Sequence, residues 1–318
     1  MPNTFNMSSS SLIEGSTSTK PSIANILTIA GSDSGGGAGI QADIKAISAT
    51  GSFACSVITA LTAQNTQGVT GILPIDAEFV GQQLDAVFSD IDIAAVKIGM
   101  LNDASVIRVI AQKLKQYQPK HVVLDPVMVA TSGDALIENS AIQTLVNTLF
   151  PLVTVITPNL PEAALLIGTQ MPAHESEIES FIQQLKAHSN LKSMKVLLKG
   201  GHFDGKQSCD WLIDGEQITV FSQPRIKTSN THGTGCTLSS ALASYLGQGF
   251  ELETAISKAK VYISHAIMAA DKLNVGRGSG PVHHFYASPV FDDMASGEIP
   301  PNELPSHGFA CDDISVKG

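Results

Sequence analysis

A run of residues late in the chain has the composition of an anion-binding site. Residues 230–237 read NTHGTGCT and lead into a segment with helical apolar spacing. Gly233 and Gly235 would expose N–H groups at the start of this helix, where the aligned peptide dipoles place about half a positive charge. Such a site suits the charge that develops on a transferring phosphoryl group. Because a helix start lowers the pKa of a thiol, we expect Cys236 to take or share the proton of an acceptor hydroxyl. The alternative interpretation of Cys236 is a small residue that only packs against the start of the helix.

A second glycine cluster follows the first apolar run. Residues 30–43 read AGSDSGGGAGIQAD, in which Ile40 breaks the dinucleotide fingerprint and Gly37 replaces the lysine of a nucleotide-phosphate loop. A nucleophile elbow centred on Asp33 is also disfavoured, because elbows follow a strand deep in the sheet order. Either the glycines let the backbone approach a ligand closely, or they form only a tight turn whose N–H groups bond Asp33.

Asn159 and Glu162 form a third candidate. They stand three residues apart in TPNLPE (residues 157–162), across a predicted helix start, and so share a face. An amide oxygen and a carboxylate in this arrangement suit the water shell of Mg²⁺. Taken alone, Glu162 is typical of a carboxylate that complements a helix dipole.

These residues can act together only if a sheet gathers them. In open α/β sheets ligands bind outside the carboxyl ends of the strands, where this chain places a series of polar residues and glycines. They are Gly31, Asp33, Gln64, Asn65, Lys97, Asp125, Thr157, Asn159, Lys199 and Gly201. For Lys97 the alternatives are contact with a substrate phosphate and a side chain that extends to solvent. His232, His283 and His284 are typical of structural histidines.

Short apolar runs alternate with amphipathic segments, which predicts a mostly parallel sheet wrapped by helices. The predicted strands are residues 26–30, 53–61, 94–98, 121–124, 152–156 and 195–198, with an antiparallel hairpin at 210–213 and 217–221. The predicted helices are one that begins near Ile40, then 76–88, 103–117, 161–168, 236–246 and 252–273. We expect one domain over residues 25–287, between a disordered Ser/Thr-rich extension (1–24) and a flexible C-terminal tail (288–318).

The composition limits the classes of function. The 318 residues carry 19 basic and 29 acidic side chains, a net charge of −10 that argues against a protein that coats nucleic acid. The four cysteines show neither a CxxC pair nor zinc-ligand spacing, and polar residues interrupt the charge-free stretch 46–75, so we expect no disulfide framework, zinc site or membrane span. The N-terminus resembles neither a secretory nor a mitochondrial signal, which favours a cytoplasmic protein.

The motifs together resemble one family. The chain contains, in order, TIAGSDSGGGAGIQAD, VITALTAQNTQGV, KIGML, VVLDPVMVATSGD, ITPNLPEA, LLKGGH, NTHGTGCTLSSALA and GRGSGPVHHF. From about Asn25 to Ala287 it resembles the hydroxymethylpyrimidine and phosphomethylpyrimidine kinases of thiamine biosynthesis, in the ribokinase-like superfamily. The resemblance implies a three-layer α/β/α domain, usually a homodimer. It also implies transfer of the γ-phosphoryl group of ATP to 4-amino-5-hydroxymethyl-2-methylpyrimidine and then to its monophosphate.

The resemblance implies roles for individual residues. The catalytic anion hole would be Gly233, Gly235 and Cys236; the pyrimidine site Gly31, Asp43 and Gln64; the ATP site Lys199, Gly201 and Thr234; and the site of Mg²⁺ and phosphates Asp125, Asn159 and Glu162. A side-chain amide matches the amino group and ring nitrogen of an aminopyrimidine, and a carboxylate accepts from the amino group. Sugar kinases of the superfamily carry an aspartate base where this chain has Cys236. In having a cysteine there, the chain resembles the hydroxymethylpyrimidine kinases and the related pyridoxal kinases.

Two alternatives remain open. One is a kinase for pyridoxal or pyridoxine, against which Gln64 and Asp43 favour the aminopyrimidine. The other is a catalytically silent protein that binds pyrimidine without transferring phosphate. The intact GTGC segment and the pairing of Asn159 with Glu162 argue against a silent protein.

Overall fold

The structure is a computed structural model of the chain that describes residues 23–101, 103–128, 139–203 and 205–288. Residues 1–22 of the predicted extension, residues 289–318 of the predicted tail and residues 129–134 of the VVLDPVMVATSGD motif lie outside the described residues. Within those ranges, no helix combines the length and apolar character needed to cross a membrane.

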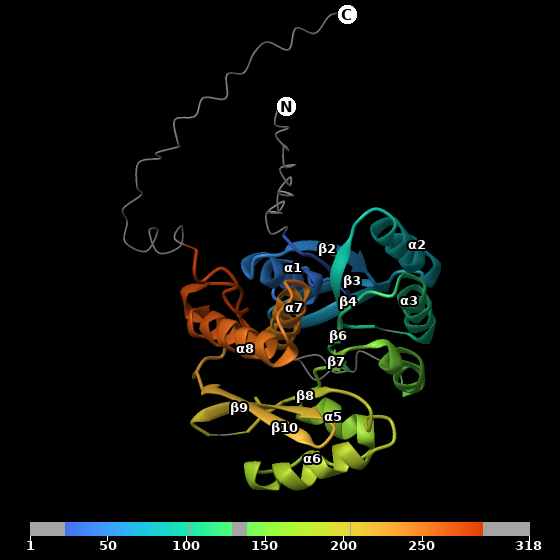
Figure 1. Cartoon of the computed structure of the whole chain (residues 1–318). Helices are drawn as coiled ribbons and strands as arrows, with labels where there is room; N and C mark the ends of the chain where they lie inside the picture. Colours follow the sequence, from blue (N-terminus) through green and yellow to red (C-terminus); the bar gives the residue numbers. More distant parts are fainter. Residues whose placement is uncertain (1–22, 102, 129–138, 204, 289–318) are drawn as a thin grey trace, which may run out of the picture.

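A mostly parallel sheet of eight strands forms the centre of the fold (Figure 1), in the order β10-β9-β8-β7-β6-β5-β1-β2. Its strands are β1 (Asn25–Ala30), β2 (Phe53–Ile58), β5 (Ile93–Ile98), β6 (Val122–Leu124), β7 (Val155–Ile156), β8 (Val196–Lys199), β9 (Gln207–Asp214) and β10 (Gln217–Pro224). The pairs from β2 to β8 are parallel, and β9 and β10 join them antiparallel. The predicted parallel sheet and its closing hairpin are confirmed.

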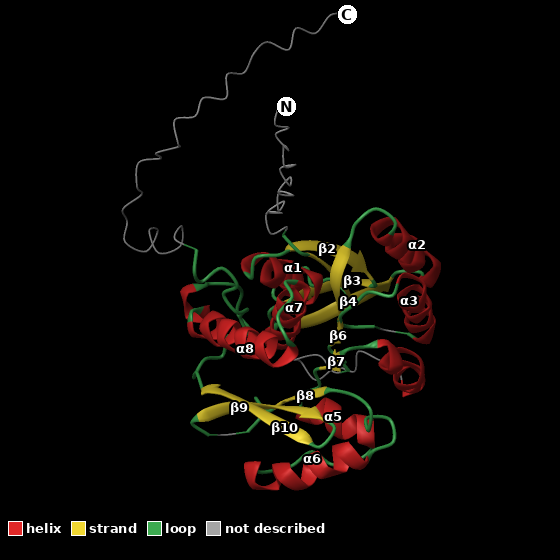
Figure 2. Cartoon of the chain, in the orientation of Figure 1, coloured by secondary structure: helices red, strands yellow, loops and turns green. Residues whose placement is uncertain are grey.

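Helices cover both faces of this sheet (Figure 2). They are α1 (Gly39–Ala49), α2 (Ala77–Phe88), α3 (Ala104–Tyr117), α4 (Asn139–Thr144), α5 (Leu160–Ile167), α6 (Ile178–Ala187), α7 (Thr234–Gly247) and α8 (Leu252–Met268). Successive strand residues point to opposite faces. Accordingly Leu27 packs in the core shared with α2 and α3, whereas its neighbour Ile26 packs in the core shared with α1, α7 and α8. The predicted three-layer α/β/α architecture is therefore confirmed.

The predicted strand 53–61 is confirmed as β2 over residues 53–58, but its predicted end is wrong, because the chain leaves the main sheet at Thr59. The residues after it form β3 (Ala60–Asn65), which pairs antiparallel with β4 (Gly68–Pro74) in a separate two-stranded sheet. Thr59 is fully buried; its N–H donates to Ala30 O at 3.0 Å and its hydroxyl donates to Met100 O at 3.0 Å. These bonds fix the point of departure, and the β3–β4 hairpin that follows carries Gln64.

Most predicted helix starts are confirmed by their caps. Asp76 accepts a hydrogen bond from Glu78 N at 2.8 Å and caps α2, and Asn159 and Glu162 form a capping box on α5. Other boundaries differ. α7 begins at Thr234, two residues before its predicted start, and α8 ends at Met268, five residues before its predicted end. The predicted strand 152–156 is shortened to β7 because Phe150–Leu152 forms a 3₁₀ turn, and α6 was not predicted.

Candidate active site

A cavity of about 200 Å³ lies at the carboxyl ends of the parallel strands. Residues far apart in the sequence line it, from Ala30 at the end of β1 to Cys236 in the first turn of α7. The structure brings most of the predicted site residues to this cavity: Gly31, Gln64, Asp125, Asn159, Glu162, Lys199, Gly233, Thr234, Gly235 and Cys236. Asp43 and Gly201 are not among the lining residues.

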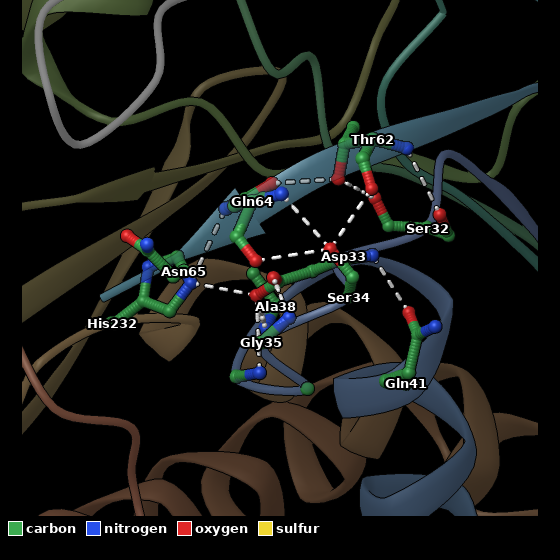
Figure 3. Close-up of polar contacts among 12 residues, drawn as sticks. Ser32, Asp33, Ser34, Gly35, Ala38, Gln41, Thr62, Gln64, Asn65 and His232 are labelled. Carbon is green, nitrogen blue, oxygen red and sulfur yellow. Dashed lines mark hydrogen bonds and ion pairs between the residues drawn. The ribbon is translucent and has the colours of Figure 1, made fainter. Parts of the chain in front are cut away.

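The first glycine cluster folds around the carboxylate of Asp33 (Figure 3), which is 2% exposed. Asp33 accepts hydrogen bonds from the N–H groups of Gly35 at 2.8 Å, Gly37 at 3.0 Å and Ala38 at 2.8 Å, and from His232 Nε2 at 2.8 Å. Burial acts to raise the pKa of Asp33, but the bonds from His232 and the backbone outweigh burial and hold this pKa below its ordinary value. The expectation that Asp33 bonds the N–H groups of the turn is confirmed.

Gln64 reaches the cavity from the β3–β4 hairpin. The Ser34 hydroxyl accepts a bond from Gln64 N at 2.9 Å and also lies 3.0 Å from Gln64 O, which ties β3 to the glycine cluster. The Gln64 carboxamide oxygen lies 3.2 Å from Thr62 Oγ1, and its nitrogen lies 3.5 Å from His232 Nε2 (Figure 3). The hairpin therefore presents a donor and an acceptor to one wall of the cavity.

The structure places Asp43 beneath the cavity, where the predicted contact with a ring is not available. Its side chain is fully buried, and its oxygens accept bonds from Lys97 Nζ at 2.8 and 2.9 Å, from Thr28 Oγ1 at 2.6 Å and from Ser240 Oγ at 2.7 Å. Lys97 is fully buried too, so it does not extend to solvent. Burial acts to lower the pKa of Lys97, but the charges of Asp43 and Asp125 and the hydrogen bond to Asp43 act together against burial, and this pKa is raised. The pair fastens α1 and β5 to α7, the helix that begins at the anion site.

The start of α7 is open to an anion. Gly233 caps the helix in the left-handed region with φ of 79° and has no side chain that could bond the N–H groups of the first turn. A Cβ on Gly233 would lie 1.8 Å from Gly37 O, and one on Gly235 would lie 3.2 Å from Lys199 Nζ. At position 233 only glycine lets the backbone approach the first glycine cluster this closely, whereas a Cβ on Gly235 would require a small shift of the Lys199 ammonium.

The predicted low pKa of the Cys236 thiol is wrong. Burial raises the pKa of Cys236 to about 11, and the nearby charges of Asp43 and Asp125 act in the same direction. The charge of Lys97 acts to lower it but is outweighed. The thiol therefore stays protonated at neutral pH, and the field of the helix start does not turn it into a resident base.

Asp125 and Lys199 form a buried ion pair at the ends of β6 and β8. Lys199 Nζ donates to Asp125 Oδ1 at 2.7 Å, and Thr157 Oγ1 donates to the same oxygen at 3.0 Å. Burial acts to raise the pKa of Asp125, but the charges of Lys199 and Lys97 and the hydrogen bonds from Lys199 and Thr157 together outweigh burial and lower this pKa. A fixed positive charge therefore stands beside Gly235 and the anion site.

Asn159 and Glu162 occupy their capping box: Asn159 N donates to Glu162 Oε2 at 2.8 Å, and Glu162 N donates to Asn159 Oδ1 at 2.8 Å. Burial raises the pKa of Glu162 to about 7; the charge of Asp125 adds to this, and Lys199 opposes it. A nearby cation would favour ionised Glu162. The oxygen donors of Asp125, Asn159 and Glu162 thus fit Mg²⁺ that keeps most of its water, although the described residues hold no group of three or more His, Cys, Asp or Glu suited to a metal.

The ATP residues are only partly gathered. Thr234 and Lys199 line the cavity, whereas Gly201 is exposed and its carbonyl accepts a bond from Arg225 Nη1 at 3.0 Å. The sequence also missed lining residues: Thr62, Val69, Met100, Val127 and His232. A Cβ on Gly31 would lie 2.6 Å from Met100 Cε, so this glycine admits the methionine to the wall.

The comparisons with known proteins agree with this geometry. The family model described as phosphomethylpyrimidine kinase matches residues 33–283. The hydroxymethylpyrimidine/phosphomethylpyrimidine kinase of Rhizobium meliloti is 51% identical over 260 residues, which cover 82% of this chain and 96% of that protein. The protein of the same name from Escherichia coli is 50% identical over 263 residues, 83% of this chain and 98% of its own length.

Solved structures are similar over most of the chain. The phosphomethylpyrimidine kinase of Clostridium difficile has a TM-score of 0.66 and 42% identity, covering 77% of this chain and 99% of its own. An ADP complex of Bacillus subtilis pyridoxal kinase has a TM-score of 0.76 and 34% identity, covering 84% of this chain and 100% of its own.

Proposed function

This chain belongs to the phosphomethylpyrimidine kinase family, and from that premise we propose that it phosphorylates 4-amino-5-hydroxymethyl-2-methylpyrimidine and then its monophosphate with ATP. It is a phosphotransferase of thiamine biosynthesis. The observation that carries the proposed chemistry is a single cavity lined by both the Gln64 carboxamide and the uncapped start of α7.

Ring recognition is proposed for the wall formed by the glycine cluster and the β3–β4 hairpin. The Gln64 carboxamide offers a donor and an acceptor, which match the ring nitrogen and amino group of an aminopyrimidine. Val69, Met100 and Val127 line the same cavity and supply apolar surface for the flat ring. Gly31 leaves room for the ring and for Met100 together.

Phosphoryl transfer is proposed at the start of α7. The first-turn N–H groups, including those of Gly235 and Cys236, and the ammonium of Lys199 would stabilise charge on the oxygens of the transferring group. Because the Cys236 thiol is protonated at neutral pH, we assign it to the geometry of the anion site. The proton of the attacking hydroxyl then passes to the oxygens of the transferred phosphoryl group, since a loose transition state places little demand on a base.

ATP as the phosphoryl donor is supported by the kinase family and by neighbours solved with ADP and with AMP-PCP. We propose that Asp125 and Glu162, with Asn159, hold Mg²⁺ through its water shell, where it would neutralise phosphate charge. Asp125 also orients Lys199 through their bond of 2.7 Å. Asp125 stands beside the start of α7, where a Cβ on Gly235 would lie 3.4 Å from its Oδ2.

A homodimer is proposed from exposed apolar side chains at one edge of the fold. Phe53 on the edge strand β2 is 59% exposed, and the cross-strand partners Leu61 and Leu73 are 41% and 62% exposed. Exposed apolar side chains on an edge strand and on a two-stranded sheet favour an interface between copies. Leu73→Asp should give the monomer mass in sedimentation analysis where the unchanged chain gives a dimer; the same mass for both would contradict the interface.

We also propose a cytoplasmic setting, which is supported by the free thiols of Cys55, Cys209 and Cys236 in the described part of the chain.

The function is tested by coupled ADP release from the purified full chain with three acceptors in parallel. The pyrimidine and its monophosphate should both be turned over, and pyridoxal should be the poorer substrate. Turnover of pyridoxal without turnover of the pyrimidine would replace the proposal with a pyridoxal kinase, which the Bacillus subtilis neighbour makes the second candidate. Calorimetric binding of the pyrimidine without ADP release would indicate a silent binding protein.

A further inference from the structure

One contact joins the two glycine clusters of the cavity. His232 Nε2 lies 2.8 Å from Asp33 Oδ2, although the two residues are 199 positions apart, and Figure 3 shows their side chains meeting across the cavity wall. The Asp33 carboxylate also accepts bonds from the N–H groups of its own glycine turn. His232 directly precedes Gly233 at the start of α7. The contact therefore links the ring-binding wall to the anion site.

The direction of this bond follows from the carboxylate. Asp33 has a lowered pKa and is ionised, so it only accepts. Nε2 of His232 must therefore carry the hydrogen and donate it to Asp33. The Gln64 amide nitrogen, 3.5 Å from the same Nε2, meets a second donor there and makes no bond with it. Its hydrogens remain available to a ligand in the cavity.

The backbone is closely packed on both sides of the contact between His232 and Asp33. A Cβ on Gly233 would lie 1.8 Å from Gly37 O, and a Cβ on Gly37 would lie 2.5 Å from His232 Cδ2. The main chain of His232 is held separately, because its N–H donates to Gly280 O at 3.1 Å. The imidazole of His232 therefore packs against the first glycine cluster at Gly37, while the main chain of His232 is bonded to Gly280. A shift of either glycine cluster would therefore displace the other.

We propose that His232 is a positioning residue for the kinase reaction: its bond to Asp33 fixes the ring-binding wall at the distance from the α7 start that aligns the acceptor hydroxyl with the phosphoryl group. The inference rests on the proposed function. It predicts an effect on the rate of transfer beyond the effect on folding, since misplacement of reacting groups by about 1 Å lowers rates by roughly 100-fold.

The test compares His232→Asn with His232→Gln in the full chain. Glutamine places an amide N–H about as far from Cα as histidine places Nε2, whereas asparagine is one methylene shorter and falls short of Asp33. His232→Asn should lower kcat for the pyrimidine roughly 10- to 100-fold, the effect expected for a lost hydrogen bond to a charged group, with a much smaller change in the KM of ATP. His232→Gln should recover most of that loss. His174→Asn, the same substitution at an exposed site, is the matched control and should behave as the unchanged chain.

Each outcome decides the inference. Thermal melts set an assay temperature at which every variant is folded. Unchanged kcat in folded His232→Asn, or equal losses in His232→Asn and His232→Gln, would overturn the positioning role. Failure of the unchanged chain to phosphorylate the pyrimidine would instead overturn the proposed function. In that case kcat for pyridoxal in the same variants still reports whether the contact aligns the acceptor with the phosphoryl group: a loss in His232→Asn that glutamine restores supports the link, and an unchanged kcat refutes it.

Discussion

Replacing Lys97 with methionine should destabilise the fold strongly, because the ion pair that it breaks is fully buried. Lys97 Nζ lies 2.8 and 2.9 Å from the two carboxylate oxygens of Asp43, and both side chains have an exposed fraction of 0%. Methionine nearly matches the shape of lysine but leaves the Asp43 charge uncompensated. Removing one partner of a buried pair lowers the free energy of unfolding by about 3–5 kcal/mol. Because the hydroxyls of Thr28 and Ser240 still donate to Asp43, we expect the lower half of that range.

The chain offers a matched control. Lys195 and Asp214 are paired at a similar 2.7 Å but are 43% and 46% exposed, so Lys195→Met should change the free energy of unfolding by less than about 1 kcal/mol. Lys97→Met combined with Asp43→Asn should recover part of the loss, since no buried charge is then left alone.

Urea denaturation followed by circular dichroism measures these differences. In thermal melts the loss for Lys97→Met corresponds to roughly 6–16 °C, at about 2–4 °C per kcal/mol for a domain of this size. Equal losses for Lys97→Met and Lys195→Met would refute the view that burial makes the Lys97–Asp43 pair decisive. A double variant less stable than Lys97→Met would refute the uncompensated charge as the cause.

Three further predictions follow from the site and the core. Because the pKa of Cys236 is raised to about 11, its alkylation by iodoacetamide, followed by mass spectrometry, should stay slow up to pH 8 and accelerate above it; fast alkylation at pH 7 would contradict the raised pKa. Gly233→Ala should lower kcat by roughly 100-fold or more in ADP-release assays, since φ of 79° and the 1.8 Å approach to Gly37 O exclude a Cβ; near-normal turnover would show that the start of α7 is not held as described. Burial, with a smaller contribution from the charge of Lys45, lowers the pKa of His284 from 6.5 to about 3, so the unfolded chain binds the extra proton between these values and stability falls as pH drops below about 6.5. His284→Gln should remove about 1.4 kcal/mol of the stability lost between pH 7.5 and 5.5 in urea titrations, and His174→Gln should not; equal pH dependence in both variants would argue against a neutral buried His284.

The sequence predicted the elements whose signals are local. The apolar run before Gly31, the capping residue Asp76 and the box of Asn159 and Glu162 each define a boundary within a few residues, and the structure confirms these boundaries. The order of the strand ends then predicts that their polar residues share one edge of the sheet. Most of the candidate cavity follows from that rule alone.

The sequence could not show how charges pair across the fold. The sequence left two environments open for Lys97 and assigned Asp43 to the pyrimidine site, and only the packing of β5 against α1 and α7 shows that the two side chains pair. The contact between Asp33 and His232 spans 199 positions and has no local pattern. The thiol of Cys236 shows the same limit, because the helix start predicts a lowered pKa and burial, which no motif encodes, reverses it.

The break at Thr59 has a related cause. Apolar and β-branched residues continue through it, so the pattern predicts one strand from 53 to 61. Periodicity reports alternation of side chains and does not report which sheet a strand joins. The hairpin that carries Gln64 was therefore not predicted, although Gln64 itself was.

The central claim is that one cavity both recognises an aminopyrimidine through Gln64 and transfers a phosphoryl group at the start of α7. The most direct measurement is kcat/KM for the pyrimidine in the unchanged chain and in Gln64→Leu, which keeps the size of the side chain and removes its amide. The account predicts a loss of roughly 10- to 100-fold, as expected for two neutral hydrogen bonds, with the KM of ATP unchanged. Equal kcat/KM in the two proteins would contradict it.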